Sequence, residues 1–280
     1  MRVGFHVSIE GALDEAVDRA VELGCTTFQM FTRTPRAWAA LELDEAEVRA
    51  FVDKVNSFDV KPIFVHAPYL LNLASARQNV YARSVEILKE ELGRCRKLEI
   101  PYLVTHLGSH LGSGKKLGFE RIIAAVNEVN RGGGCGVTLL LENTAGTRNS
   151  MGSRFEDIGH IIGSLTRPEA VGVCFDTAHG FAAGYDLRSE KAVDRTLRSF
   201  DESIGFKRLR LVHLNDSLGG FNSRIDRHQH IGLGEIGEEG FRAILHSKLV
   251  ELPLIMETPW EEPGSDVDNM RKVKELAGEP

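Results

Sequence analysis

The chain has 280 residues, of which 42% are hydrophobic and 26% are charged, and its formal net charge at pH 7 is −6. A chain of this length can bury a sizeable core, and no apolar run approaches the roughly 20 residues of a membrane span. The N-terminus, MRVGFHVSIEGALDEA, has no long apolar stretch and turns acidic early, which argues against a secretory signal. We expect a soluble, cytoplasmic protein without a membrane partner.

Strand-like apolar runs alternate with amphipathic stretches along the whole chain. The runs cover residues 3–7, 26–31, 62–66, 102–106, 137–142, 171–176, 209–213 and 253–257. The stretches with helical periodicity cover residues 11–23, 44–58, 79–98, 119–130, 154–165, 190–204 and 239–246, and a short last one covers 271–276. This alternation indicates a parallel sheet, and eight such units are typical of a closed barrel. We predict one α/β domain over residues 1–280, a (β/α)8 TIM barrel with its active site at the C-terminal ends of the strands.

An open doubly wound sheet is the alternative fold. Residues 231–237, IGLGEIG, even contain the G-x-G-x-x-G spacing of a dinucleotide fingerprint. That motif should follow an apolar strand, whereas the preceding residues here are DRHQH. We therefore interpret these glycines as shaping a surface loop.

Six of the apolar runs end on a residue that can bind a metal ion. These residues are His66, His106, Glu142, Asp176, His213 and Glu257. A polar side chain at the end of a buried strand is costly unless a group outside the strand satisfies it. One such histidine alone is more often an ordinary hydrogen-bonded core residue. Six equivalent placements, however, predict one shared polar site at the face where barrel strands end.

Two short patterns add three candidates. In Asp176-Thr-Ala-His179, the histidine follows the strand-end aspartate and is expected on the emerging loop. In Asp226-Arg-His228, the spacing places both side chains on one side of an extended segment. A mixed nitrogen and oxygen set suits zinc, with manganese as the weaker alternative, and His6 is a candidate supporting donor. Nine ligands exceed the needs of one tetrahedral ion, so bridging carboxylates would let them serve two or three ions.

The negative net charge argues at first sight against a nucleic-acid partner. Three bound divalent ions would cancel that charge, and several acidic residues would then be ligands rather than solvated surface. Overall charge therefore does not decide the question.

Several long sequence blocks occur in order through nearly the whole chain. They are HAPYLLNLAS at 66–75, HLGSHLGSG at 106–114, LLLENTAG at 139–146, VCFDTAHGFAAGYDLR at 173–188, LVHLNDS at 211–217 and DRHQHIGLGEIG at 226–237. With these blocks the sequence resembles the endonuclease IV family, zinc-dependent enzymes that cut DNA at abasic sites. The resemblance implies the same (β/α)8 barrel that the periodicity predicts.

The resemblance also implies three zinc ions per chain, with every ligand present. By that resemblance the first ion is held by His66 and His106, and Glu142 bridges it to the second ion. The second ion is completed by Asp176, His213 and Glu257. The third ion is bound by His179, Asp226 and His228.

The implied reaction is hydrolysis of the phosphodiester on the 5′ side of an abasic nucleotide in double-stranded DNA. It leaves a 3′-hydroxyl and a 5′-deoxyribose phosphate. By the same resemblance Glu142 is the catalytic residue, which positions or deprotonates the attacking water. The family usually acts as a monomer, so a monomer is expected here.

Damage recognition by the family implies a second set of residues. Arg36, Tyr69 and Leu70 match the loops with which the family fills the gap left by a flipped nucleotide, and a missing base lowers the cost of flipping. Arg33 and Arg227 fall in loops and are candidate phosphate contacts.

Two positions depart from the family pattern. Leu218 stands where the family commonly has lysine, and Asn222 stands where glycine is commoner. Neither is a candidate ligand, so we expect weaker or differently salt-dependent DNA binding with the chemistry intact.

Two other functions are weighed against the nuclease. A sugar isomerase or epimerase of the xylose-isomerase-like barrels needs one or two metal ions and has no use for His179, Asp226 and His228 as a third cluster. A non-catalytic protein that binds zinc or damaged DNA is the second alternative. About three zinc ions per chain would fit the nuclease, and one or two would favour the isomerase.

Overall fold

The fold is a closed barrel of parallel strands, seen in a computed structural model that describes residues 1–131, 136–259 and 265–278. The strands are β1 (Val3–Val7), β2 (Phe28–Met30), β3 (Ile63–His66), β4 (Tyr102–Thr105), β5 (Thr138–Glu142), β6 (Val171–Asp176), β7 (Leu209–His213) and β10 (Leu254–Met256). They are ordered β1-β10-β7-β6-β5-β4-β3-β2, and β1 closes the barrel by pairing with both β10 and β2. The predicted α/β barrel is confirmed, and all eight strands overlap the predicted runs.

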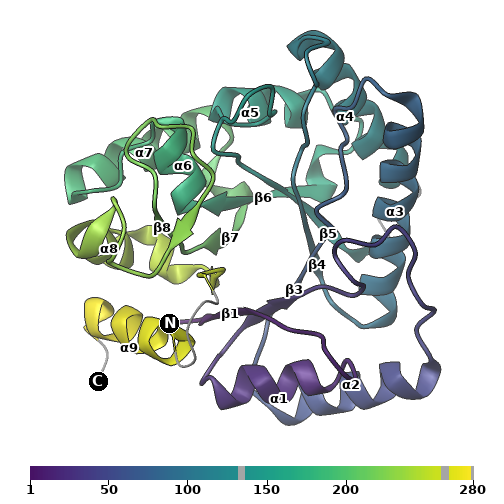
Figure 1. Ribbon diagram of the computed structural model, residues 1–280, viewed down its shortest axis with the longest axis horizontal. Coiled ribbons are helices and arrows are strands. Elements are labelled where there is room, and N and C mark those ends of the chain that lie inside the picture. The colour runs from purple at the N-terminus through teal and green to yellow at the C-terminus, as the bar shows by residue number, and fades with distance from the viewer. Residues whose placement is uncertain (132–135, 260–264, 279–280) are drawn as a thin grey trace.

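Helices surround the barrel (Figure 1). They are α1 (Glu15–Glu22), α2 (Glu45–Ser57), α3 (Gln78–Lys97), α4 (Lys115–Val129), α5 (Phe155–Gly163), α6 (Thr177–Ala183), α7 (Glu190–Ser203), α8 (Gly237–Leu245) and α9 (Ser265–Ala277), with short 3-10 turns η2 (Pro168–Ala170), η3 (Phe206–Arg208) and η4 (Lys248–Glu251). The last helix begins earlier than its predicted start at residue 271. None of the helices in the described part of the chain has the length and hydrophobicity to cross a bilayer.

Local sequence signals explain several helix ends. The Asp44 side chain accepts hydrogen bonds from the backbone N–H groups of Ala46 and Glu47, and so caps the first turn of α2. Gly24 and Gly205 follow α1 and α7 with φ values of +71° and +91°, a left-handed conformation that glycine adopts without steric cost. These turns reverse the chain so that each helix leads into the next strand.

The barrel interior contains two stacked layers of side chains. The lower one, here called the apolar layer, consists of fully buried residues: Phe64, Val104, Leu140, Cys174, Leu211 and Ile255. Successive side chains of a strand point to opposite faces, so the residue two positions further along each strand also points inward. These are the six predicted strand-end residues, His66, His106, Glu142, Asp176, His213 and Glu257, here called the polar layer. The other side of the strands packs against the helices in a second, larger apolar cluster.

Two elements near this face were not predicted. His179 lies in the first turn of α6 rather than on a loop, so the expected loop position was wrong. A two-stranded antiparallel ribbon, β8 (Asp216–Ser217) with β9 (His228–Gln229), forms within the long segment after β7.

Candidate metal centre

Glu142 lies at the centre of the polar layer and is fully buried. Its Oε2 is 3.3 Å from His66 Nε2 and 3.1 Å from His106 Nε2. Its Oε1 is 3.2 Å from His213 Nδ1 and 3.3 Å from His179 Nδ1. One carboxylate from β5 thus faces histidines that come from four different segments of the chain.

Three groups of side chains bring their ligand atoms within 4.8 Å of one another. They are His66, His106 and Glu142; Glu142, Asp176, His213 and Glu257; and Asp176, His179 and His228. Glu142 belongs to the first two groups and Asp176 to the last two, so carboxylates join the three groups into one cluster. Asp226 lies beside the third group, with its Oδ1 3.1 Å from His179 Nε2. The structure therefore brings all nine candidate side chains together.

Hydrogen bonds fix the orientation of the histidine rings. In three of them Nδ1 lies within hydrogen-bond distance of a backbone carbonyl oxygen. The pairs are His66 with Ala67 at 2.6 Å, His179 with Asn143 at 3.0 Å, and His228 with Glu257 at 3.0 Å. A carbonyl oxygen only accepts, so each Nδ1 carries a proton. The Nε2 atoms are then left facing carboxylates: Glu142 for His66, Asp226 for His179 and Asp176 for His228. His228 Nε2 is 3.4 Å from Asp176 Oδ2 and, among the described residues, has no hydrogen-bond partner.

A positive charge is required between the histidine rings and the carboxylates of this cluster. The lone pair of a neutral ring nitrogen repels a carboxylate oxygen at about 3 Å, so either a second proton or a metal cation must lie between them. Burial alone lowers the pKa of His106 and His179, yet the surrounding carboxylates raise both pKa values above the ordinary 6.5. Burial likewise raises the pKa of Glu142, but His106 and His213 hold it well below its usual range. A divalent metal ion would supply the same charge, so the donor set fits a metal cation.

Two asparagines hold Asp176 in place at the end of β6. Asn215 Nδ2 donates to Asp176 Oδ2 at 2.7 Å, and Asn143 bonds the backbone N–H and carbonyl of Asp176. The other carboxylate oxygen, Oδ1, accepts from the N–H of His179 at 2.7 Å and caps α6. The same aspartate therefore starts the helix that carries His179 and directs an oxygen into the cluster.

The segment between β7 and α8 folds around the buried carboxylate of Asp216. Backbone N–H groups of Ser217, Gly232, Gly234, Ile236 and Gly237 donate to its two oxygens at 2.7 to 3.3 Å. The glycines of the IGLGEIG stretch thus shape a loop, as predicted, and a Cβ at Gly234 would meet Asp216 Oδ1 at 2.6 Å. Asp226 and His228 precede this loop in the same segment, and His228 pairs with Ser217, next to Asp216.

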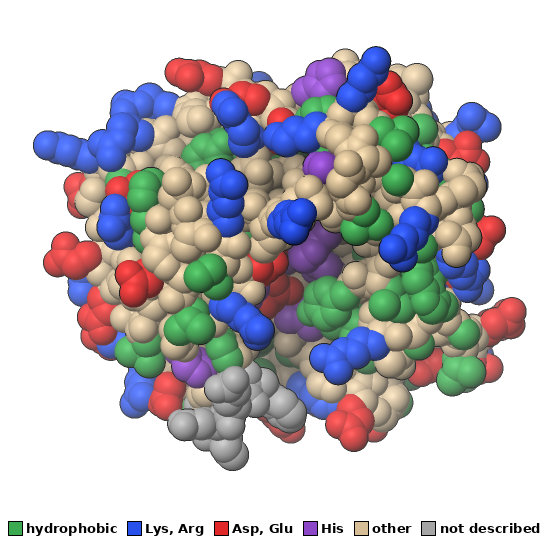
Figure 2. Space-filling view, turned by 45° about the horizontal axis from the view of Figure 1, so that its top comes forward, with side chains coloured by type: hydrophobic (Ala, Val, Ile, Leu, Met, Phe, Trp, Pro, Cys, Tyr) green, Lys and Arg blue, Asp and Glu red, His purple; other side chains and the backbone are tan. Residues whose placement is uncertain are grey.

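The candidate DNA contacts surround the polar layer. Arg36, Tyr69 and Arg227 are exposed and Leu70 is half-buried. The Tyr69 ring packs edge-on against Phe31 and tilted against His66, which fixes it beside the cluster. Figure 2 shows histidine and acidic side chains in a hollow of one face, with lysine and arginine side chains around it.

Arg33 was wrongly predicted as a phosphate contact. It is 4% exposed, with its Nε 2.6 Å from Glu91 Oε1 and its Nη2 2.9 Å from Glu90 Oε2. Because both partners belong to α3, this ion pair holds the loop after β2, which carries Arg36, against that helix.

The two departures from the family pattern have different structural settings. Leu218 is 57% exposed at the end of the β8 strand, where a lysine would reach solvent. Asn222 has φ +58°, a left-handed conformation that asparagine tolerates far better than most residues, and its N–H donates to Phe181 O. Asparagine and glycine can both adopt this backbone conformation, so the second departure is sterically compatible with the loop.

Sequence reasoning missed Gln29, which lies fully buried on β2 beside the cluster. Its amide bonds His213, Glu257 and His6. The available signal was Gln29 itself, a lone amide within the apolar run 26–31, where a buried polar group needs a partner. Thr27 precedes it by two residues. His6 was predicted as a supporting donor; its Nδ1 lies 3.2 Å from Glu257 Oε1 and 2.9 Å from Gln29 Nε2.

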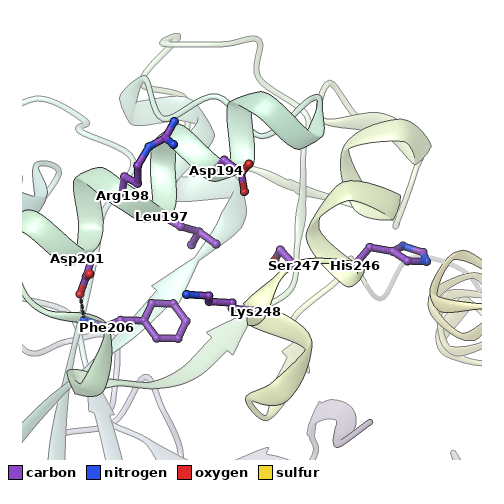
Figure 3. Close-up of a pocket in the computed structure, with 8 residues that line it drawn as sticks. All are labelled: Asp194, Leu197, Arg198, Asp201, Phe206, His246, Ser247 and Lys248. Atoms are coloured by element: carbon purple, nitrogen blue, oxygen red, sulfur yellow. Dashed lines mark hydrogen bonds between the residues drawn. The ribbon is translucent and has the colours of Figure 1, made fainter.

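A separate cavity of about 470 Å³ lies between α7 and η4, away from the polar layer (Figure 3). Its lining residues are Asp194, Leu197, Arg198, Asp201, Phe206, His246, Ser247 and Lys248. None of the nine candidate ligands borders it, so its exposed His246 provides a comparison position for experiments on the cluster.

Comparison with known proteins identifies the class first. Residues 17–277 match the family of xylose isomerase-like TIM barrels, in agreement with the closed barrel and the polar layer at its strand ends. A probable endonuclease 4 of Methanoculleus marisnigri is 51% identical over 278 residues, which are 99% of each protein. The crystal structure of endonuclease IV from Thermus thermophilus matches with a TM-score of 0.88 at 36% identity over 99% of each chain. The chain belongs to the endonuclease IV family and is a hydrolase of the nuclease class.

Other solved barrels share the fold alone. A D-tagatose 3-epimerase-like protein matches with a TM-score of 0.74 but at 19% identity. Its likeness supports the barrel and carries no argument for epimerase chemistry in this chain.

Proposed function

We propose that this protein is a DNA-repair endonuclease that hydrolyses the phosphodiester 5′ to an abasic site. The products are a 3′-hydroxyl and a 5′-deoxyribose phosphate, and the cofactor is a cluster of three zinc ions. The observation that carries the proposal is the joining of three ligand groups through Glu142 and Asp176. In a single-ion or two-ion site, His179, His228 and Asp226 would have no metal ion to bind.

The assignment of ligands to ions follows the three groups. The first ion would be held by His66, His106 and Glu142, and the second by Glu142, Asp176, His213 and Glu257. The third would be held by His179 and His228, with Asp176 or Asp226 as the carboxylate. Imidazole nitrogen and carboxylate oxygen suit zinc, and manganese would be a substitute. Bound zinc lowers the pKa of a water to about 7 and neutralises charge on a phosphodiester.

The exposure of the ligands indicates where substrate would enter. The His213 and Asp176 side chains are fully buried, whereas the His106 and Asp226 side chains are 35% and 47% exposed. The solvent-exposed ligands therefore belong to the first and third groups, whose His106 and His179 rings are neighbours, with centroids 5.8 Å apart. A phosphodiester placed across this opening would lie above Glu142, which holds the attacking water in the proposed reaction.

The rim would provide the contacts to duplex DNA. Arg36 and Arg227 are exposed cations that would meet phosphates, while Tyr69 and Leu70 would fill the space of the extruded nucleotide. The basic side chains around the hollow in Figure 2 provide a local positive field that the net charge of −6 conceals. We propose that the protein acts on such DNA as a monomer.

A duplex oligonucleotide with one tetrahydrofuran abasic analogue tests this function. The analogue cannot undergo β-elimination, so any cut must be hydrolytic. The expected result is one cut 5′ to the lesion with a 3′-hydroxyl end, together with about three zinc ions per folded chain by elemental analysis. The matched controls are His106→Ala in the cluster, which should lose activity and zinc, and His246→Ala just after the C-terminus of α8, which should retain both.

Two results would overturn the proposal. An intact duplex with folded, zinc-loaded protein would exclude abasic endonuclease activity. One or two ions per chain would remove the basis for the trinuclear cluster and favour the sugar isomerases.

A further inference from the structure

Gln29 is a buried amide on the one side of the cluster where neighbouring strands supply no candidate ligand. It lies on β2, fully buried, and its register partner on β1 is His6. Its Oε1 is 2.9 Å from His213 Nε2, and its Nε2 is 2.7 Å from Glu257 Oε1 and 2.9 Å from His6 Nδ1. One side chain thus contacts two residues of the second ligand group.

The orientation of this amide follows from its partners. A carboxylate oxygen only accepts hydrogen bonds, so the atom 2.7 Å from Glu257 Oε1 must be the amide nitrogen. The reversed amide would bring two oxygens together at that distance. Gln29 Oε1 therefore faces His213, and His213 Nε2 must carry the proton that it accepts.

This bond decides which nitrogen of His213 faces the cluster. With the proton on Nε2, the lone pair is on Nδ1, which lies 3.2 Å from Glu142 Oε1 and 3.3 Å from Glu257 Oε2. The other outer nitrogens described above donate to backbone carbonyls, which no substitution removes. His213 depends on a side chain for the same function.

The same amide also fixes Glu257. Its Oε1 accepts from Gln29 Nε2, its backbone N–H donates to Asn215 Oδ1 at 2.7 Å, and its Oε2 is left facing His213 Nδ1. Two ligand atoms of the second group, one nitrogen and one oxygen, are thus aimed by a single residue.

We propose that Gln29 is a positioning residue that selects the Nδ1 face of His213 and the Oε2 atom of Glu257 for the second metal ion. The inference rests on the proposed zinc cluster. Outer-sphere partners of this kind change metal affinity by about 10–100-fold when they are removed. Loss of Gln29 therefore acts on the second ion and leaves the ligands of the other two groups in place.

The test compares Gln29→Met with the wild type and with Thr27→Val. Methionine keeps the length of the side chain and removes its hydrogen bonds to His213, Glu257 and His6. Thr27→Val removes one buried bond, to Pro62 O, from the same inward-facing side of the chain without contact to the cluster. The measurements are zinc retained per chain against a graded series of chelators, and the thermal midpoint of each protein in excess EDTA.

In Gln29→Met, we expect one of the zinc ions to be removed by chelators whose zinc affinity is about 10–100-fold lower than that needed for the wild type. The other zinc ions should be retained as in the wild type. The midpoints in EDTA report how far each substitution destabilises the zinc-free fold, which separates positioning from stability. Should Gln29→Met fail to fold, Gln29→Asn, whose shorter amide cannot span His213 and Glu257, takes its place.

Retention of every zinc equivalent by Gln29→Met, or equal zinc loss from Thr27→Val, would overturn the inference. Absence of zinc from the folded wild type would instead overturn the proposed function, so the two failures are distinguishable.

Discussion

The apolar layer and the polar layer of the barrel lie two residues apart on the same strands, yet they have opposite chemistry. Leu140 and Glu142 both point inward from β5, and both are fully buried. Leu140 packs among five other closely fitting side chains, whereas Glu142 is surrounded by ring nitrogens. The comparison teaches that burial in this barrel has two uses: the lower layer contributes stability, and the upper layer concentrates charge.

The largest effect is expected from Glu142→Gln in the polar layer. The amide keeps the shape but removes the charge shared by the first two ligand groups. Cleavage of the tetrahydrofuran duplex should fall by about 10²–10⁴-fold, the range of a lost acid–base group. The rate is measured under single-turnover conditions, with elemental analysis of zinc on the same sample. An active Glu142→Gln protein would remove this carboxylate from the reaction.

Leu140→Ala should give the converse result in the apolar layer. The cavity left by a buried leucine typically costs about 2–5 kcal/mol of unfolding free energy. Urea unfolding in EDTA measures that loss. Zinc per folded chain and the cleavage rate below the unfolding transition should stay near wild type. A large loss of zinc from folded Leu140→Ala would show that the two layers are not separable.

The pH dependence of stability should reverse when zinc is added. In the zinc-free protein, burial lowers the pKa of His106 and His179, but Glu142 near the first, and Asp176 and Asp226 near the second, raise both above 6.5. A raised histidine pKa stabilises the fold fully below pH 6.5, and that contribution is lost as the pH rises through the raised values. Zinc displaces these protons, so its affinity falls as the pH falls through the same values.

Thermal midpoints at about pH 5.5 and about pH 8.5, in EDTA and in zinc, measure this reversal. We expect the EDTA sample to be less stable at the higher pH and the stabilisation by zinc to be larger there. Zinc stabilisation that is equal at both pH values would contradict the assignment of these rings as ligands.

The smallest effect is expected at the rim, outside both layers. Leu218→Lys adds a cation where the family commonly has one, and it should make one further phosphate contact. The slope of log affinity for abasic duplex against log salt should then steepen by about 1, with the single-turnover rate unchanged. Binding to zinc-loaded Glu142→Gln protein measures the slope without cleavage. An unchanged slope would place residue 218 away from the DNA.

Much of the barrel and of the polar layer was predictable because the relevant signals are local. An apolar run that ends on His66 or Glu257 reports both a buried strand and a polar group at its end. The strand boundaries shifted by one or two residues where the runs extended into loops, as at residue 26, where the structure begins β2 at Phe28. The helix α6 was missed because Thr-Ala-His-Gly-Phe-Ala-Ala is short and buried almost all round, so it lacks an amphipathic period.

The remaining features depend on partners far away in the sequence. Arg33 resembled a loop cation, but its partners Glu90 and Glu91 lie 57 and 58 residues away on α3. Gln29 bonds Glu257 across 228 residues, and no local pattern distinguishes that amide from an ordinary polar residue in a strand. The Gln29–Glu257 pairing appears only when the barrel closes, because β1 then pairs with β10 on one side and with β2 on the other.

The Asp216 carboxylate orders the glycine-rich loop at residues 231–237 from within the chain. Glycine-rich loops of this spacing elsewhere receive an anion from a nucleotide, whereas here the chain supplies its own anion from β8. The loop is thereby closed to a phosphate ligand and ordered as soon as the fold forms. Because His228 pairs with Ser217, next to Asp216, the segment that carries Asp226 and His228 is arranged as part of the same fold. A third ligand group arranged in this way would bind an ion with an affinity set by chemistry at the ligand atoms rather than by loop closure.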